Sequence, residues 1–350
     1  MIKHKHGGDV YRHRDCLDFS ANLNPLGTPE SVRAAIRESA DHIAQYPEVG
    51  SVTLREKIAE YEGVGTEEII CGNGAAELIF TLCRAVKPKK ALVPAPTFAE
   101  YGQALSGMGC ELEYYMLTEH NGFVLDDSYL DVLHKGLDMA FLCNPNNPTG
   151  LLIPHSLLKK ILEKCRHLGI LLVIDECFLD FVKEPEAYTL KQSLSGFRNL
   201  FILKAFTKRY AMAGVRLGYG LCSDVRLTEQ MELNVQPWNI STMAQAAGIQ
   251  ALKEKDYVEK GRQLVFEESA WMKDEMTKMG YKVFASQANY IFFKGPEELY
   301  DLCLRKRILI RDCSNYPGLS RGYYRVAVKK HEENIKLMEA LEGGRLWQKQ

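Results

Sequence analysis

Short apolar runs alternate with amphipathic stretches through the middle of the chain. Between about Glu68 and Tyr219, β-rich runs lie at 67–72, 90–96, 110–117, 138–144, 170–176 and 201–206. Helical patterns separate several of these runs, at 74–86, 98–108 and 154–169. Strands that are apolar on both faces and are separated by helices indicate a mostly parallel sheet covered on both sides. We therefore predict an α/β, doubly wound lobe.

The pattern changes toward both ends of the chain. Beyond Trp238 it predicts long helices over about 241–279, short strands at 289–294, 307–312 and 323–328, and a last helix from about Glu332. Near the N-terminus, Thr28 is placed as an N-cap, Pro29 lies in the first turn and an amphipathic run reaches Ile43. Because 350 residues exceed what one core usually holds, we predict a large domain over 46–240 and a smaller α+β domain from 1–45 and 241–350.

Composition narrows the class of protein. Hydrophobic residues make up 46% and charged residues 25%, which is typical of a globular protein. The net charge of −1, without a basic stripe, argues against nucleic-acid binding. The ten cysteines form no CxxC pair and favour a reducing compartment. Neither a signal peptide nor a membrane span is recognisable. We expect a cytoplasmic protein without a metal, nucleic-acid or membrane partner.

Two polar turns directly follow predicted strands. In ICGNGAAELI a strand stops at Cys71 and a helix begins near Gly74, so the amides of Gly74, Ala75 and Ala76 could hold a phosphate. A plain strand-to-helix turn would look the same. The second turn, LCNPNNPTG at 142–150, is dense in Asn and Pro, which fixes an irregular loop and aims an amide side chain at the edge of the sheet.

Two charged residues also stand at strand ends, where open α/β sheets bind ligands. Asp175 closes the apolar run LLVID, and a buried carboxylate needs a cation such as a pyridinium nitrogen, although it could instead cap a helix or pair with an arginine. Lys208 lies just past a strand, eight residues before Arg216. A lysine of lowered pKa attacks aldehydes, and an arginine suits a phosphate, although most lysines are solvated surface charges.

Taken together, GNGAAELI, NPNNPTG, Asp175 and TKxxxxxGxRxGY resemble the fold type I pyridoxal-phosphate (PLP) enzymes of the aspartate aminotransferase superfamily, in the same order and at similar separations. Four further motifs narrow the resemblance to the L-threonine O-3-phosphate decarboxylases, relatives of the histidinol-phosphate aminotransferases: HGGD at 6–9, LDFSANLNPLG at 17–27, QYP at 45–47 and ILIRDCSNYPGLSRGYYRVAVK at 308–329. The resemblance extends from about residue 4 to residue 340.

The resemblance implies roles in binding the cofactor, pyridoxal 5'-phosphate. Lys208 would carry it as a Schiff base, Asp175 would hold the pyridinium proton and Asn147 would bond the phenolic oxygen. The remaining implied contacts are stacking by Phe98, phosphate binding by Arg216, Thr207 and the amides near Ala75, and a phosphate contact by Tyr46 from the other subunit of a homodimer. Phe98 could instead be a core aromatic residue.

The resemblance also implies a substrate site and a reaction. Arg325 would bind the α-carboxylate, Arg311 and His6 the substrate phosphate, and Asn24 another part of the substrate. Structural salt bridges for the arginines, and an exposed position for His6, are the alternatives. The implied reaction is decarboxylation of L-threonine O-3-phosphate to (R)-1-aminopropan-2-yl phosphate, used in assembly of the cobalamin nucleotide loop.

Two other functions are weighed against this one. Histidinol-phosphate transamination would exchange the amino group with 2-oxoglutarate and glutamate. A catalytically silent regulator would need an added DNA-binding module, for which 1–45 is too short. The chain also departs from its relatives at two positions: Ala205 stands where a serine commonly binds the cofactor phosphate, and Phe178 replaces a tyrosine found in many aminotransferases. The second departure weakens the case for an efficient aminotransferase.

Overall fold

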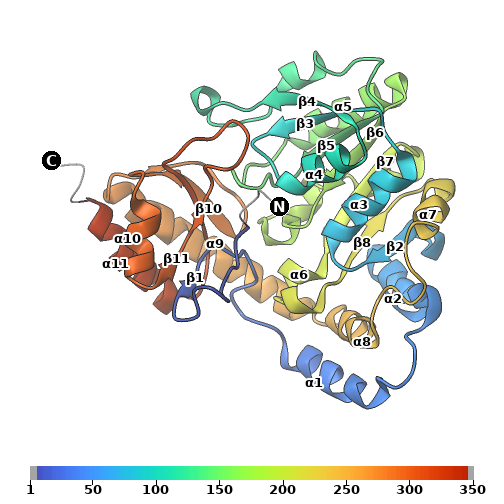
Figure 1. Cartoon of the computed structure of the whole chain (residues 1–350), viewed down its shortest axis with the longest axis horizontal. Coiled ribbons are helices and arrows are strands. Elements are labelled where there is room, and N and C mark those ends of the chain that lie inside the picture. The colour runs from blue at the N-terminus through green and yellow to red at the C-terminus, as the bar shows by residue number, and fades with distance from the viewer. Residues whose placement is uncertain (1–5, 346–350) are drawn as a thin grey trace.

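The computed structural model describes residues 6–345, which form two lobes (Figure 1). A seven-stranded sheet of order β2-β8-β7-β6-β5-β3-β4 runs through the larger lobe. Within it only β8 is antiparallel to its neighbours. The strands are β2 (Ile69–Gly72), β3 (Lys90–Ala95), β4 (Glu111–Met116), β5 (Met139–Cys143), β6 (Leu171–Asp175), β7 (Leu200–Ala205) and β8 (Gly218–Leu221). The predicted α/β class and mostly parallel sheet are confirmed.

Helices cover both faces of this sheet because its strands are apolar on both sides. On β6, Leu172 and Ile174 enter the core shared with α2, α5 and α8, whereas Val173 enters the core shared with α3, α4 and α7. These helices are α2 (Val52–Glu62), α3 (Ala75–Val86), α4 (Ala99–Gly107), α5 (His155–Leu168), α7 (Val225–Glu232) and α8 (Thr242–Ala251). A one-turn helix, α6 (Phe206–Arg209), directly follows β7.

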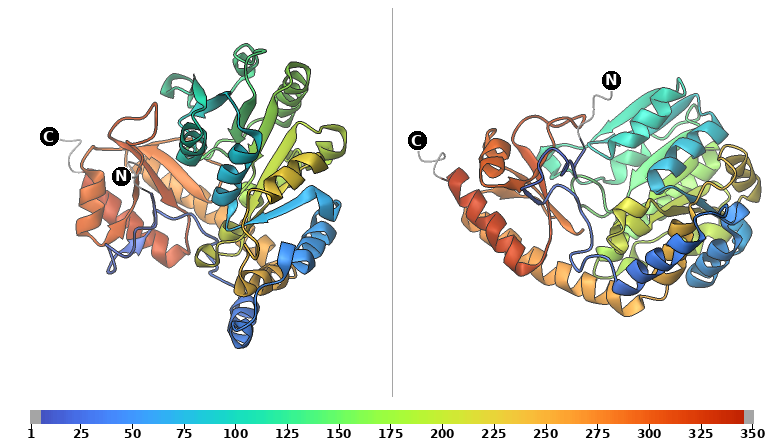
Figure 2. Two further views of the ribbon diagram at one scale, coloured as in Figure 1. Left: turned by 45° about the vertical axis from the view of Figure 1, so that its right-hand side comes forward. Right: turned by 60° about the horizontal axis from the view of Figure 1, so that its bottom comes forward.

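The smaller lobe combines the two ends of the chain (Figure 2). It holds a four-stranded antiparallel sheet of order β12-β13-β10-β9 and a parallel pair in which β1 lies beside β11. Its strands are β1 (Leu17–Asp18), β9 (Lys282–Val283), β10 (Tyr290–Lys294), β11 (Ile308–Leu309), β12 (Arg311–Asp312) and β13 (Tyr323–Ala327). Its helices are α9 (Lys255–Lys278), which also contacts the larger lobe at Leu179–Phe181, α10 (Leu299–Arg305) and α11 (His331–Arg345).

The N-terminal helix differs from its prediction. Helix α1 (Glu30–Ser39) is followed by a 3-10 turn at Ala40–His42, so the α-helix is shorter than expected. Thr28 does not cap it, because its hydroxyl donates to the carbonyl oxygen of Ala211 at 2.7 Å. Helix α1 packs against α8, which contacts α2, whereas β1 lies in the smaller lobe. The domain boundaries at 45 and 240 stay predictions.

Two further properties hold for the described part of the chain. Within 6–345, no helix joins enough length to enough apolar character to cross a bilayer. All ten cysteines fall in this part of the chain and are free thiols, nine of them buried. The fold is therefore held by packing and hydrogen bonds rather than by disulfides.

Candidate active site

A cavity of about 360 Å³ lies where three neighbouring parallel strands end. Cys143, Asp175 and Ala205, the last residues of β5, β6 and β7, all line it. This is the carboxyl edge at which open α/β sheets bind ligands. The structure gathers there most of the residues singled out from the sequence, namely His6, Gly74, Ala75, Ala76, Phe98, Asn147, Asp175, Thr207, Lys208, Arg216, Arg311 and Arg325.

Lys208 projects into the cavity from the short helix α6. Burial lowers the pKa of its amine, and the positive charges of Arg325 and Arg216 lower it further. Its Nζ lies 5.6 Å from the centre of the Phe178 ring. A lowered pKa leaves a larger share of the amine neutral, and the neutral amine is the form that attacks an aldehyde.

The carboxylate of Asp175 is buried and is held by two donors. The hydroxyl of Tyr101 donates to Oδ2 at 2.6 Å, and the backbone N–H of Cys177 donates to Oδ1 at 2.9 Å. Burial raises the pKa of Tyr101 well above its usual value, and the charge of Asp175 adds to this, so the hydroxyl stays protonated and remains a donor. The ring of Tyr101 is itself stacked on Phe141. The carboxylate therefore has a fixed orientation at the cavity.

The backbone at the start of α3 lies against the guanidinium group of Arg216. Gly74 precedes the helix with a φ of +81°, and a Cβ there would lie 2.8 Å from Nη2 of Arg216. A Cβ on Gly218 would lie 2.6 Å from the backbone nitrogen of Ala75. Helix N-terminal amides beside an arginine bind phosphate. With Thr207, Lys208 and Asp175 on the same cavity, these residues fit a phosphorylated pyridine aldehyde.

A second guanidinium group, that of Arg325, is buried in the cavity wall. Its Nη1 donates to Oδ1 of Asn147, and its Nη2 donates to the carbonyl oxygen of Ser20 at 2.8 Å. Its Nε finds no hydrogen-bond partner within 6–345. Two hydrogen bonds thus fix Arg325, and within this part of the chain no carboxylate forms an ion pair with it. A buried arginine of this kind suits an anionic ligand such as a carboxylate.

Arg311 comes from β12, on the smaller-lobe side of the cavity. Its Nη1 donates to the carbonyl oxygen of Asp312 at 2.7 Å and its Nη2 to Oδ1 of Asn315 at 2.9 Å. The guanidinium carbon also lies 5.2 Å from the ring centre of Tyr316. These contacts hold the guanidinium group of Arg311 in place, and within the described chain no carboxylate forms an ion pair with it.

Two predicted residues lie outside the cavity. Asn24 is buried, but its Nδ2 donates to the carbonyl oxygen of Arg209 and its Oδ1 accepts from the N–H of Leu26. The side chain of Asn24 joins the N-terminal segment to α6, and its expected substrate contact stays a prediction. Tyr46 is 78% exposed and stacks on Trp238, with ring centres 4.4 Å apart.

Several cavity residues escaped the sequence reasoning. Asn22 is buried with its Oδ1 unpartnered among residues 6–345, and it lines the cavity with Ser20 and Tyr316. Glu100 also lines it. Ser20, Asn22 and Tyr316 come from irregular segments whose spacing carries no signal, whereas Glu100 lies in the first turn of α4. Tyr101, the next residue of α4, reaches the site through its hydrogen bond to Asp175.

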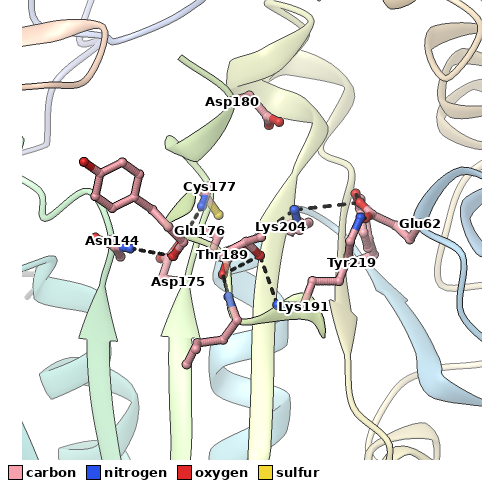
Figure 3. Close-up of polar contacts among 12 residues, drawn as sticks. Glu62, Asn144, Asp175, Glu176, Cys177, Asp180, Thr189, Lys191, Lys204 and Tyr219 are labelled. Atoms are coloured by element: carbon pink, nitrogen blue, oxygen red, sulfur yellow. Dashed lines mark hydrogen bonds and ion pairs between the residues drawn. The ribbon is translucent and has the colours of Figure 1, made fainter. Parts of the chain in front are cut away.

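A buried ionic cluster, Glu62, Glu176, Lys191 and Lys204, lies next to the strand ends (Figure 3). Nζ of Lys204 is 3.5 Å from Glu176 and 3.9 Å from Glu62, and Nζ of Lys191 is 3.0 Å from Glu62. Burial alone would raise the pKa of Glu62, but the two lysines bring it down to about 2. Glu176 directly follows Asp175, so the cluster ties the end of β6 to β7.

The fold and this cavity define a class of protein. Residues 14–341 match the aminotransferase class I and II family, and the chain belongs to that family. It is 39% identical over 329 residues to the threonine-phosphate decarboxylase of Salmonella typhimurium, covering 93% of this chain and 90% of that one. An adenosylcobalamin biosynthesis bifunctional protein of Leptospira interrogans is 29% identical over 96% of this chain and 40% of its own length.

A solved structure agrees with these relationships. The histidinol-phosphate aminotransferase of Clostridium acetobutylicum superimposes with a TM-score of 0.87 at 31% identity, covering 94% of this chain and 99% of that one. The predicted fold class, superfamily and resemblance to threonine-phosphate decarboxylases are thereby confirmed. The individual roles of the site residues stay predictions.

Proposed function

We propose that this chain is a PLP-dependent carboxy-lyase that decarboxylates L-threonine O-3-phosphate to (R)-1-aminopropan-2-yl phosphate, for assembly of the cobalamin nucleotide loop. One observation carries the proposal. A single cavity combines Lys208, Asp175 and the Arg216 end of α3 with two more arginines, Arg325 and Arg311. The first group suits the cofactor, and the second suits the two anionic ends of a phosphorylated amino acid. Greater identity to a decarboxylase than to the solved aminotransferase also supports it.

The cofactor would be held by residues that converge on the larger-lobe side of the cavity. Asp175 pairs with the pyridinium nitrogen, Phe98 lies against the ring, and Asn147 bonds the phenolic oxygen. The cofactor phosphate is bound by Arg216, Thr207 and the backbone amides at the start of α3. When bound, the cofactor supplies an electron sink for the α-carbon of an amino acid. The Asp175 carboxylate keeps the ring nitrogen protonated, which strengthens that sink.

The substrate would lie between two cationic anchors. Arg325 binds the α-carboxylate, and Arg311 with His6 binds the phosphate at the other end. Holding both ends fixes rotation about the α-carbon and so selects which of its bonds breaks. The amine of Lys208 then carries a proton to the α-carbon after carbon dioxide leaves, as a general acid of lowered pKa does best near neutral pH.

The active enzyme would be a cytoplasmic homodimer. Tyr46 stacks on Trp238 (42% exposed), which lines a surface cleft with Val49 (63%), and Ile43 (66%) is a further exposed apolar residue three positions before Tyr46. Covering such a patch removes apolar area from water. In the dimer, Tyr46 reaches the cofactor phosphate of the partner subunit. The ten unpaired cysteines support a reducing compartment.

The test is release of carbon dioxide from L-threonine O-3-phosphate by the purified, cofactor-loaded protein without a keto acid. We expect turnover that is lost in Lys208→Ala together with the visible absorbance of the bound cofactor. Serine phosphate lacks one methyl group, so its kcat/KM should be lower, corresponding to ~1–3 kcal/mol in activation free energy. A requirement for 2-oxoglutarate, with histidinol phosphate as the better amino donor, would establish the aminotransferase instead.

A further inference from the structure

An ion pair between His6 and Glu100 lies in the wall of the cavity. Nδ1 of His6 lies 3.1 Å from Oε1 of Glu100, which stands in the first turn of α4. Both residues line the cavity with Arg311. The side chain of Glu100 is only 13% exposed, and its Oε2 has no hydrogen-bond partner in the described part of the chain. A carboxylate is thus placed among groups expected to bind a phosphate, which it would repel if it acted alone.

The backbone brings His6 to this position through close packing. A Cβ on Gly7 would lie 2.2 Å from the carbonyl oxygen of Ser20, so only glycine allows the N-terminal segment to lie this near. The N–H of Gly8 donates to Oγ of Ser20 at 2.7 Å. Ser20 also accepts a hydrogen bond from Arg325. The segment that carries His6 is therefore attached to the same residue that positions the buried arginine.

The pair has a defined electrostatic effect. A carboxylate at Nδ1 keeps a proton on that nitrogen and orients the ring, which leaves Nε2 for a ligand. The hydrogen bond and charge of Glu100 raise the pKa of His6, although burial and the charge of Arg311 act in the opposite direction. These two residues, from α4 and β12, are the charged groups that face the imidazole from the elements around it.

We infer that Glu100 is a positioning residue that keeps His6 doubly protonated, so that His6 and Arg311 together bind the phosphate dianion of the substrate. Glu100 acts through His6 and does not itself contact the phosphate. The inference rests on the proposed function, because it assumes a substrate phosphate at Arg311. The Glu100–His6 pair thereby favours a phosphate over a singly charged carboxylate at that end of the substrate.

The decisive variant is Glu100→Gln, which keeps a hydrogen-bond acceptor for His6 and removes the charge. Its His6 should titrate at or below the ordinary value near 6.5, so the imidazolium fraction falls about 20-fold between pH 7 and 8.5. The substrate phosphate is already mostly dianionic in that range. KM for the phosphorylated substrate should therefore rise by up to about 20-fold in the variant and much less in the wild type. In His6→Gln, KM should be high and nearly independent of pH.

A matched control exists on the surface. His134 and Glu113 form a similar pair at 2.9 Å outside the cavity, so Glu113→Gln should leave KM and its pH profile unchanged. Parallel KM profiles for wild type and Glu100→Gln, or an unchanged KM in His6→Gln, would overturn the inference. The NMR titration of His6 in labelled holoenzyme, assigned with His6→Gln, tests the pair separately. If the pKa of His6 falls in Glu100→Gln but the wild-type holoenzyme does not turn over L-threonine O-3-phosphate, the proposed substrate is rejected and the role of Glu100 is kept. An equal pKa of His6 in Glu100→Gln and in the wild type would reject the role of Glu100.

Discussion

Replacement of Lys204 by methionine tests the buried ionic cluster. Lys204 has only 12% of its side chain exposed and is the cation nearest to Glu176. Burial opposes its charge, yet the carboxylates of Glu62 and Glu176 raise its pKa. Methionine has a similar volume, so the variant removes the charge without opening a cavity. Removing one partner from a buried ion pair leaves an uncompensated charge and costs about 3–5 kcal/mol.

The cost should depend on pH in a definite direction. Burial already raises the pKa of Glu176 although Lys204 lowers it, so loss of Lys204 raises that pKa further. Glu62 keeps Lys191 and Arg209, so the main effect falls on Glu176. The destabilising effect of the charged Glu176 is therefore largest at high pH and shrinks as pH falls and it becomes protonated. Thermal unfolding of holoenzyme at pH 8 should show a Tm lower by roughly 6–10 °C, since ~1 kcal/mol moves Tm by about 2 °C in a large chain. The gap between variant and wild type should narrow at pH 5.5.

Two further variants serve as controls for Lys204→Met. Lys278→Met removes an exposed lysine that pairs with Asp274 and Glu275, and such surface pairs contribute little to stability. Its Tm should stay near that of the wild type. Adding Glu176→Gln to Lys204→Met should recover part of the loss, because one buried charge is then gone. A Tm for Lys204→Met equal to that of Lys278→Met, or a gap that is the same at both pH values, would refute the reasoning.

Two further predictions concern cofactor binding. Tyr101→Phe removes the hydroxyl that donates to Asp175, and since a hydrogen bond to a charged group is worth about 1.5–3 kcal/mol, cofactor affinity should fall at least roughly tenfold, as measured by fluorescence titration of apoenzyme. Equal affinities would show that the hydroxyl does not orient the carboxylate. Gly74→Ala should weaken binding as well, because its Cβ would lie 2.8 Å from Nη2 of Arg216. Gly63→Ala is the control, since Gly63 also has a positive φ (+71°) but nothing within 4 Å of its Cβ, and it should lower stability without changing cofactor affinity.

Local patterns predicted more of the larger lobe than of the N-terminal segment. The strand ending at Asp175 was recognisable because every residue from Leu172 to Asp175 is buried and apolar residues precede the carboxylate. The cap at Thr28 was misplaced because its hydroxyl is used in a contact 183 residues away in sequence. The hydrogen bond from Asn24 to the carbonyl oxygen of Arg209 was unpredictable for the same reason, because the two residues are 185 positions apart.

The sequence by itself determined the alternation of strands and helices, the glycine at the start of α3, and the charged residues that end strands, because these depend on neighbours within a few positions. Only the tertiary structure decided which distant groups meet. It joined Glu100 to His6, Tyr101 to Asp175 and Lys204 to two glutamates. These contacts depend on how strands are ordered in the sheet and on how the N-terminal segment crosses to the cavity, and neither leaves a periodic signal in the chain.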